Sequence, residues 1–145
     1  MRWSRISTLI AGLMSISTLT FVVASLVHFG VGLPLIPADP FSGAALPEAI
    51  IAVVLGAGAI TVLARRGATW QIALGTTLFA LLGVLVGLRF VLFGSVSRPG
   101  DVVYHLSILA VLLVTIGMLL TSAGREALRP PLQARIGARG GRDAR

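Results

Sequence analysis

The 145-residue sequence contains no cysteine, no lysine and no asparagine, and it has only five acidic residues. Without cysteine the chain has no disulfide framework, no thiolate metal site and no thiol redox centre. Without asparagine it has no acceptor for N-glycosylation. All twelve basic residues are therefore arginines, and the formal net charge is +7. The use of arginine in place of lysine, together with abundant alanine and glycine, is typical of GC-rich bacterial coding and suggests a bacterial protein.

The chain is rich in apolar residues and poor in charged ones. Hydrophobic residues make up 56% of the chain, charged residues 12%, and the mean hydropathy is +0.97, which is outside the range of an ordinary soluble domain. Four apolar stretches are each long enough to cross ~30 Å of hydrocarbon at ~1.5 Å per residue. They cover residues 7–29, 46–63, 70–93 and 102–121. The sequence therefore predicts an all-α, four-helix transmembrane bundle.

The arginines predict how this bundle is oriented. Ten of the twelve fall on one side of the predicted spans: two before the first, two between the second and third, and six after the fourth. Because arginine and lysine accumulate on the cytoplasmic side, both termini are expected in the cytoplasm, with an up-down-up-down order of helices. Trp3 and Trp70 stand at the two inner starts, where indole prefers the headgroup region. The predicted location is the plasma (inner) membrane of a bacterium.

An alternative for the first span is a cleaved signal peptide. Arg2 and Arg5 precede an apolar run, and a small-residue cleavage site is available after Ala24. The apolar part of a signal peptide is ~7–15 residues, whereas this run continues to Phe29. The length of the run favours a retained span.

Two segments lie outside the spans. The loop 30–45 has prolines at 34, 37 and 40, so we expect a stiff connector that lies over the outer ends of the helices. Gly124 is expected to end the fourth helix, which gives a four-span domain 1–124 and a basic tail 125–145. The tail is predicted to be disordered or to lie on anionic lipid. No aromatic residue is interleaved with its arginines, so nucleic-acid binding is not predicted.

Glycines mark the expected helix-packing surfaces. Gly83 and Gly87 form a G-x-x-x-G pair in the third span, and Gly56 follows Ala52 by one turn in the second. Small residues at this spacing let membrane helices approach closely. The pattern does not decide whether the contact lies within one chain or between copies in a homo-oligomer.

Ionisable residues in the spans gather near the predicted outer side. They are His28 in the first span, Glu48 in the second, Arg89 in the third, and Asp101 and His105 at the start of the fourth. Ionisable groups in a span are unfavourable and are usually paired or functional. We therefore expect a shared outer cluster, with Tyr104 beside it.

Two interpretations of this cluster remain open. Imidazole and carboxylate groups are suitable for a metal, a proton relay to a quinol, or a haem held by two histidines. Alternatively the groups are structural, because the acids are expected at helix N-termini and His28 and Arg89 near C-termini, where the helix dipole stabilises each by ~0.3–1 kcal/mol. Arg89 is also near enough to the interface to extend its charge into it. The structural interpretation is favoured, and no metal or cofactor is identified.

The second span carries a resemblance to a known family. The chain reads Pro47-Glu48-Ala49-Ile50-Ile51-Ala52-Val53-Val54-Leu55-Gly56 and then reaches Arg65-Arg66. A glutamate that opens the second span, a glycine-containing apolar helix and a basic inner turn resemble the DoxX-like family of small four-helix membrane proteins. The resemblance covers residues 46–90 and implies a membrane subunit linked to quinone or thiol-oxidation systems, with Glu48 as the matching position. The glycine and lysine of that family near the end of the first helix are not matched, and His28-Phe29-Gly30 stands there instead.

No catalytic motif is present, so no enzyme activity is predicted. The leading hypothesis is a small, non-catalytic accessory or assembly component that packs against a protein partner or a second copy in the bilayer. The alternative is a redox-associated subunit that binds a quinone-like ligand at the outer cluster. A solute transporter is least favoured, because no charge lies at mid-span and no inverted repeat is evident.

Overall fold

The computed structural model describes residues 4–64, 69–94 and 99–129. Five helices occupy these ranges: α1 (Arg5–His28), α2 (Ser42–Ala64), α3 (Thr69–Phe93), α4 (Pro99–Leu120) and α5 (Ser122–Ala127). The first four are long and apolar enough to cross a membrane, so the prediction of an all-helical protein with four such helices is confirmed. This composition indicates a small multi-pass membrane protein. The arginines at 2, 65, 66, 98 and in the tail beyond 129 lie outside the described residues, as does Trp3.

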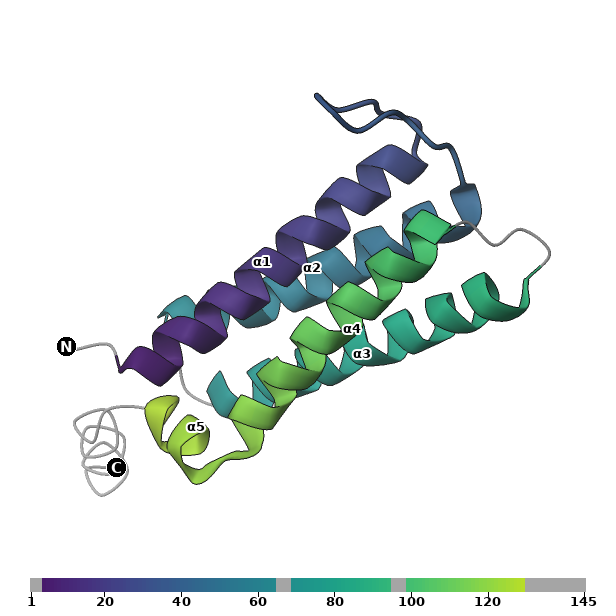
Figure 1. Ribbon diagram of the computed structural model, residues 1–145. Coiled ribbons are helices and arrows are strands. Elements are labelled where there is room, and N and C mark those ends of the chain that lie inside the picture. Colours follow the sequence, from purple (N-terminus) through teal and green to yellow (C-terminus); the bar gives the residue numbers. More distant parts are fainter. Residues whose placement is uncertain (1–3, 65–68, 95–98, 130–145) are drawn as a thin grey trace, which may run out of the picture.

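The four long helices form one bundle (Figure 1). α1 packs against α2 and α4, and α3 packs against the same two helices. The last residue of α1 meets the start of α2 through His28 and Glu48, whereas the start of α3 meets the end of α4 through Trp70 and Leu119. We call these two regions the His28 end and the Trp70 end.

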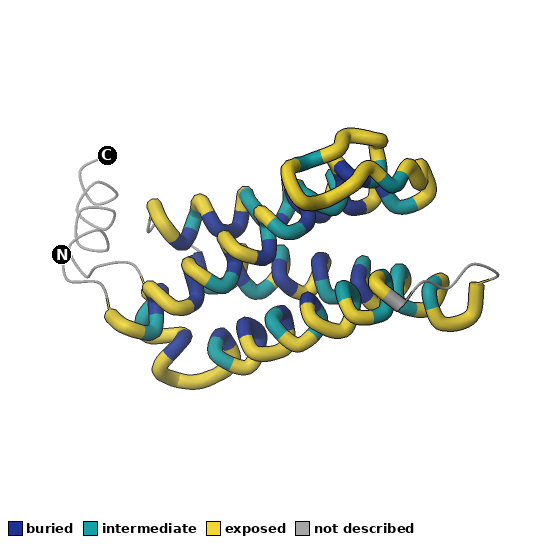
Figure 2. Tube along the Cα trace, turned by 45° about the horizontal axis from the view of Figure 1, so that its top comes forward, coloured by how far each residue is buried: buried dark blue, intermediate teal, exposed yellow. Residues whose placement is uncertain are grey.

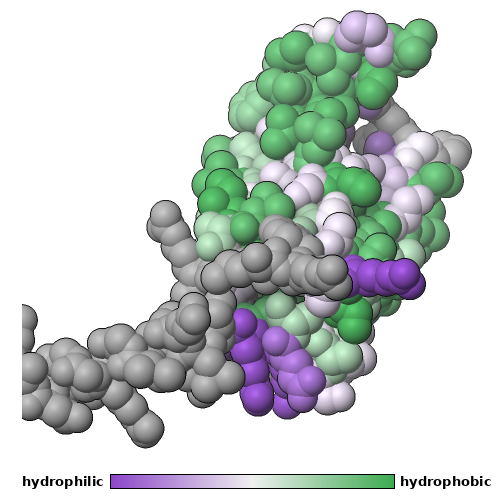
Figure 3. Space-filling view, turned by 90° about the vertical axis from the view of Figure 1, so that its left-hand side faces the viewer, coloured by the Kyte–Doolittle hydropathy of each residue, from purple (hydrophilic) through white to green (hydrophobic). Residues whose placement is uncertain are grey.

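Each helix turns one apolar face inward and another outward (Figure 2). Phe21, Leu55, Val84 and Leu112 are among the core residues, one from each long helix. Large apolar residues also cover the outside of the bundle, and hydrophobic surface extends over much of the molecule in the space-filling view (Figure 3). An apolar exterior of this extent is expected of helices that face lipid.

Helix α2 begins earlier than predicted, at Ser42 instead of residue 46. Pro47 is therefore the sixth residue of the helix and not part of its first turn. Proline at this position lacks the N–H that would bond to the carbonyl of Gly43. Glu48 consequently lies in the second turn, and the expectation that the dipole at the helix start accounts for its position is wrong.

The start of α4 also differs from the expected one. The fourth span was predicted to start at residue 102, but the helix begins at Pro99 and Asp101 lies within its first turn. Proline is favoured at the first helical position because its missing N–H would have no partner there. Asp101 still lies where an acidic side chain is stabilised by the helix dipole.

The end of α4 is Leu120, and Gly124 does not end it. The Thr121 hydroxyl accepts a hydrogen bond from the Gly124 amide at 2.9 Å and starts the short helix α5. Leu128, just after α5, is buried in the core. The packed part of the chain therefore extends past residue 124, and tail residues 130–145 lie outside the described residues.

Candidate functional site

The closest polar contact between the spans joins α1 to α2. The His28 Nδ1 lies 2.6 Å from the Glu48 Oε2, and their side chains are only 14% and 8% exposed. One turn earlier on both helices, the Ser25 hydroxyl donates to the Ala45 carbonyl at 2.8 Å. Two consecutive polar contacts therefore fix the rotation and the register of α1 against α2.

Helix α4 contributes two aromatic residues, Tyr104 and His105, next to Glu48. The Glu48 carboxyl interacts electrostatically with both Tyr104 and His105, and the rings of these two residues meet edge to face with centroids 4.9 Å apart. The Tyr104 hydroxyl is buried and has no hydrogen-bond partner of standard geometry among the described residues. We call His28, Glu48, Tyr104 and His105 the four-residue polar cluster.

The tautomer of His105 follows from its contact with the backbone. Its Nδ1 lies 2.8 Å from the Asp101 carbonyl oxygen. A carbonyl oxygen only accepts, so Nδ1 carries the proton and a neutral ring leaves Nε2 as the acceptor. His105 therefore offers one imidazole nitrogen to a neighbour while the other is bonded within its own helix.

Helix α3 contributes backbone to this region, not a charged side chain. A Cβ placed on Gly87 would lie 2.5 Å from the His105 Nε2 and 3.0 Å from its Cδ2. Glycine at this position makes room for the imidazole ring against α3. All four long helices thus meet around the cluster.

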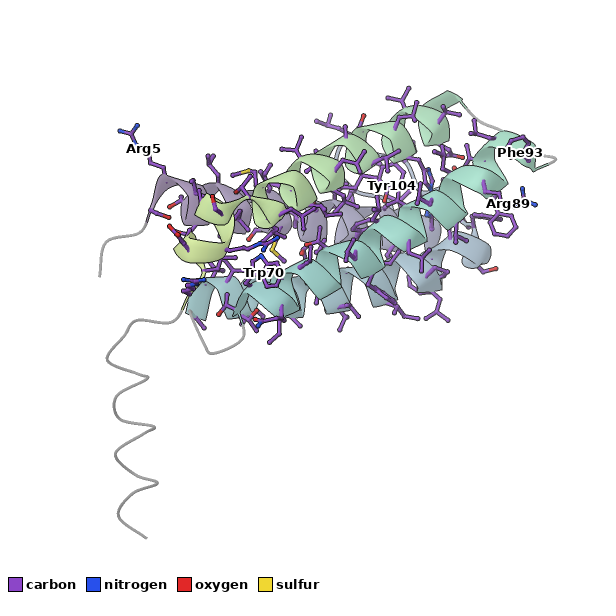
Figure 4. All side chains as sticks on the ribbon, turned by 90° about the horizontal axis from the view of Figure 1, so that it is seen from below. Arg5, Trp70, Arg89, Phe93 and Tyr104 are labelled. Atoms are coloured by element: carbon purple, nitrogen blue, oxygen red, sulfur yellow. The ribbon has the colours of Figure 1, made fainter. Side chains whose placement is uncertain are left out.

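Two of the residues predicted for the outer cluster are placed differently. Arg89 is exposed, and its guanidinium carbon lies 5.8 Å from the centre of the Phe93 ring. Figure 4 shows Arg89 and Phe93 at the edge of the bundle, whereas Tyr104 lies between the helices. Asp101 contacts the cluster through its backbone carbonyl, which bonds to His105. Within the described ranges its carboxylate forms no ion pair.

The predicted packing glycines lie against neighbouring helices of the same chain. A Cβ on Gly83 would collide with the Ile51 side chain of α2, and one on Gly56 would lie 3.2 Å from the Thr18 methyl group of α1. Gly58 is the most tightly packed of the α2 glycines, because a Cβ there would collide with Thr76 of α3.

The chemistry available to the cluster is proton sharing and hydrogen bonding. A carboxyl, an imidazole and a phenol can exchange protons or bind the oxygens of a ligand. Within residues 4–64, 69–94 and 99–129, no three histidine or acidic side chains are grouped so that they could hold a metal ion.

His28, Glu48 and His105, predicted from the sequence to share one cluster, lie near one another in the structure. Tyr104 was named only as a neighbour, although a tyrosine near the start of a membrane span usually has a polar partner for its hydroxyl. No family model, no curated protein and no solved structure matches this chain.

Proposed function

We propose that this chain is a non-catalytic accessory or assembly component of a membrane complex, with an up-down-up-down bundle, both termini in the cytoplasm and a location in the bacterial plasma membrane. In this proposal the four-residue polar cluster holds the helices together at the His28 end. The bundle then presents an apolar exterior to lipid and to a protein partner.

The contact between His28 and Glu48 carries this proposal. The His28 Nδ1 and the Glu48 Oε2 are hydrogen-bonded to each other at 2.6 Å. Both side chains are largely buried. Paired ionisable groups of this kind stabilise a helix contact, whereas a catalytic base requires access to a substrate. Arg89, an exposed charged residue of α3 near this end, points away from the cluster.

The proposal is tested by purification of the full-length tagged chain from its native membrane in a mild detergent. A stable partner protein is expected to accompany it. The double variant His28→Ala/Glu48→Ala should lose the partner because the helices are no longer fixed, whereas Arg89→Ala should retain it. Recovery of a lone, partner-free chain under conditions that keep it folded would contradict the proposal.

A second candidate function is binding of a quinone-like ligand, in agreement with the resemblance to DoxX-like proteins. The observation that favours it is the buried Tyr104 hydroxyl, which interacts with Glu48 but forms no hydrogen bond of standard geometry among the described residues, since such a group is available for the carbonyl oxygen of a ligand. Addition of a soluble ubiquinone analogue should raise the melting temperature of the wild-type protein and leave that of Tyr104→Phe unchanged. An equal response of the two proteins, or none, would remove this candidate.

A further inference from the structure

The segment between α1 and α2 folds into a compact loop that is attached to the end of α1. The backbone amides of Val31, Asp39 and Phe41 donate to the carbonyls of Leu26, Val27 and His28, at 2.9–3.2 Å. Figure 1 shows the loop projecting to the side of the bundle, beyond α1, and not across the ends of the other helices. The expectation that it covers the helix ends is therefore wrong, because its anchoring bonds go to α1.

The tip of the loop holds a leucine in an unfavourable backbone conformation. Leu33 and Ile36 exchange both backbone hydrogen bonds, at 2.9 and 3.0 Å, around Pro34 and Leu35. Leu35 has a φ of 72°, the left-handed value that the third position of a type II turn requires and that normally selects glycine. A leucine there is strained, and this leucine is also fully exposed.

Contacts within the protein do not stabilise the Leu35 side chain, because it is fully exposed. A glycine would relieve the backbone, and a polar residue would suit exposure to water. A large apolar side chain at this position becomes favourable only when something outside the chain buries it, because transfer of a leucine out of water offsets the strain of the left-handed backbone.

The surroundings of Leu35 indicate lipid as the covering material. Phe29, Val31, Ile36 and Phe41 are also exposed, at 42–61%. Asp39, the one charged residue between positions 29 and 41, is half-buried. The apolar surface continues into Leu26 of α1 and Leu46 of α2, which face outward from the bundle. Because the loop projects sideways at the level where α1 ends, its tip lies over the lipid that surrounds the bundle.

We propose that residues 29–41 form an interfacial lipid anchor, in which the turn Leu33–Ile36 inserts Leu35 into the bilayer at the His28 end. The anchor requires no partner protein, and its far end contacts the polar cluster, because the Phe41 ring lies edge to face with the His28 ring with centroids 6.2 Å apart. It fixes the depth of α1 and α2 in the membrane and immobilises the chain that connects them.

The absence of cysteine allows a direct test in the full chain. Single-cysteine variants Leu35→Cys and Phe41→Cys are labelled with an environment-sensitive fluorophore and reconstituted into phosphatidylcholine vesicles. Ile60→Cys, on the outward face of α2, is the lipid-exposed control, and Arg129→Cys is the water-exposed control. Fluorescence is then measured with nitroxide-labelled lipids and with iodide on both sides of the membrane.

Labels at positions 35 and 41 are expected to be quenched by nitroxides in the upper acyl chain, like a lipid-exposed site, and to resist iodide. Iodide quenching as strong as that at position 129 would show a loop in water and would overturn the proposal. Protection from both quenchers would show burial against protein and would overturn it as well. The variant Leu35→Gly should keep the melting temperature of the wild-type protein in detergent, which separates loss of the anchor from loss of the fold.

Discussion

At the scale of single residues, the polar groups in the spans are explained by their partners. His28 and Glu48 bond to each other, Ser25 bonds to a backbone carbonyl, and most threonine hydroxyls bond back to their own helix. A polar group without a partner is unfavourable in a bilayer because no water can replace the missing bond. The bundle therefore depends on a small number of specific polar contacts.

Loss of either member of the His28–Glu48 pair should destabilise the bundle. We expect Glu48→Ala and His28→Ala each to lower the free energy of unfolding in micelles by about 1–2 kcal/mol, as for hydrogen bonds between membrane helices. The double variant should lose little more than either single one, which a double-mutant cycle measures. Arg89→Ala is the matched control and should change stability little, because its side chain is exposed. Fully additive losses at positions 28 and 48 would show that the two side chains do not interact.

At the scale of helices, close approach depends on glycine at defined positions. Gly58 of α2 allows Thr76 of α3 and Met14 of α1 to come into contact with the helix backbone. Gly75 of α3, in contrast, has open space where a side chain would stand. Gly58 is therefore required for close packing, whereas Gly75 is a glycine that the helix tolerates without any packing role.

Substitution of Gly58 by alanine should weaken the contact between α2 and α3. The new methyl group would meet the Thr76 Cβ at 2.9 Å, which lies next to the backbone and cannot move aside easily. We expect a loss of about 1–3 kcal/mol, typical of an overpacked interior, measured as unfolding in a detergent titration. Gly75→Ala, which meets no neighbour, should leave stability unchanged or raise it. Equal effects of the two substitutions would argue against tight packing at Gly58.

The helices were predictable from sequence, but their rotation was not. Long apolar runs predicted all four spans, with errors of a few residues where Ser42–Ala45 extends α2 and Pro99 begins α4. A membrane helix is apolar on the face toward its neighbours and on the face toward lipid, so hydrophobic periodicity does not show which face turns inward. For this reason Arg89 was grouped with His28 and Glu48 although it points away, and the central position of Tyr104 was missed. Contacts that depend on how each helix is rotated about its axis can be identified only from the three-dimensional structure.

At the scale of the whole molecule, described charges are concentrated at the ends of the bundle. Arg5, Arg125 and Arg129 lie at the Trp70 end, where the guanidinium of Arg125 stands 5.2 Å from the Trp70 ring centre and the Trp70 indole donates to the Leu119 carbonyl at 2.7 Å. Indole is typical of either membrane interface, and an excess of arginine is typical of the cytoplasmic one.

The proposed orientation predicts which side of a membrane each end faces. In intact bacterial cells, a cysteine introduced at the exposed residue Ser42, which begins α2 outside the proposed lipid anchor, should react with a membrane-impermeant maleimide. A cysteine at Arg129 should react only after the cells are permeabilised, because the positive-inside rule places the Trp70 end in the cytoplasm. The natural chain has no cysteine and supplies the unlabelled control. Reaction at position 129 in intact cells would reverse the orientation.

The pairing of Ser25 with Ala45 and of His28 with Glu48 has a consequence for biogenesis. Each contact joins residues 20 positions apart, so both lie within the first helical hairpin, which is synthesised before α3 and α4. The Glu48 carboxyl can enter the bilayer already bonded to His28, which reduces the penalty of taking it out of water. Within this hairpin the polar contacts need no residue of α3 or α4, whereas the interactions of Glu48 with Tyr104 and His105 require α4.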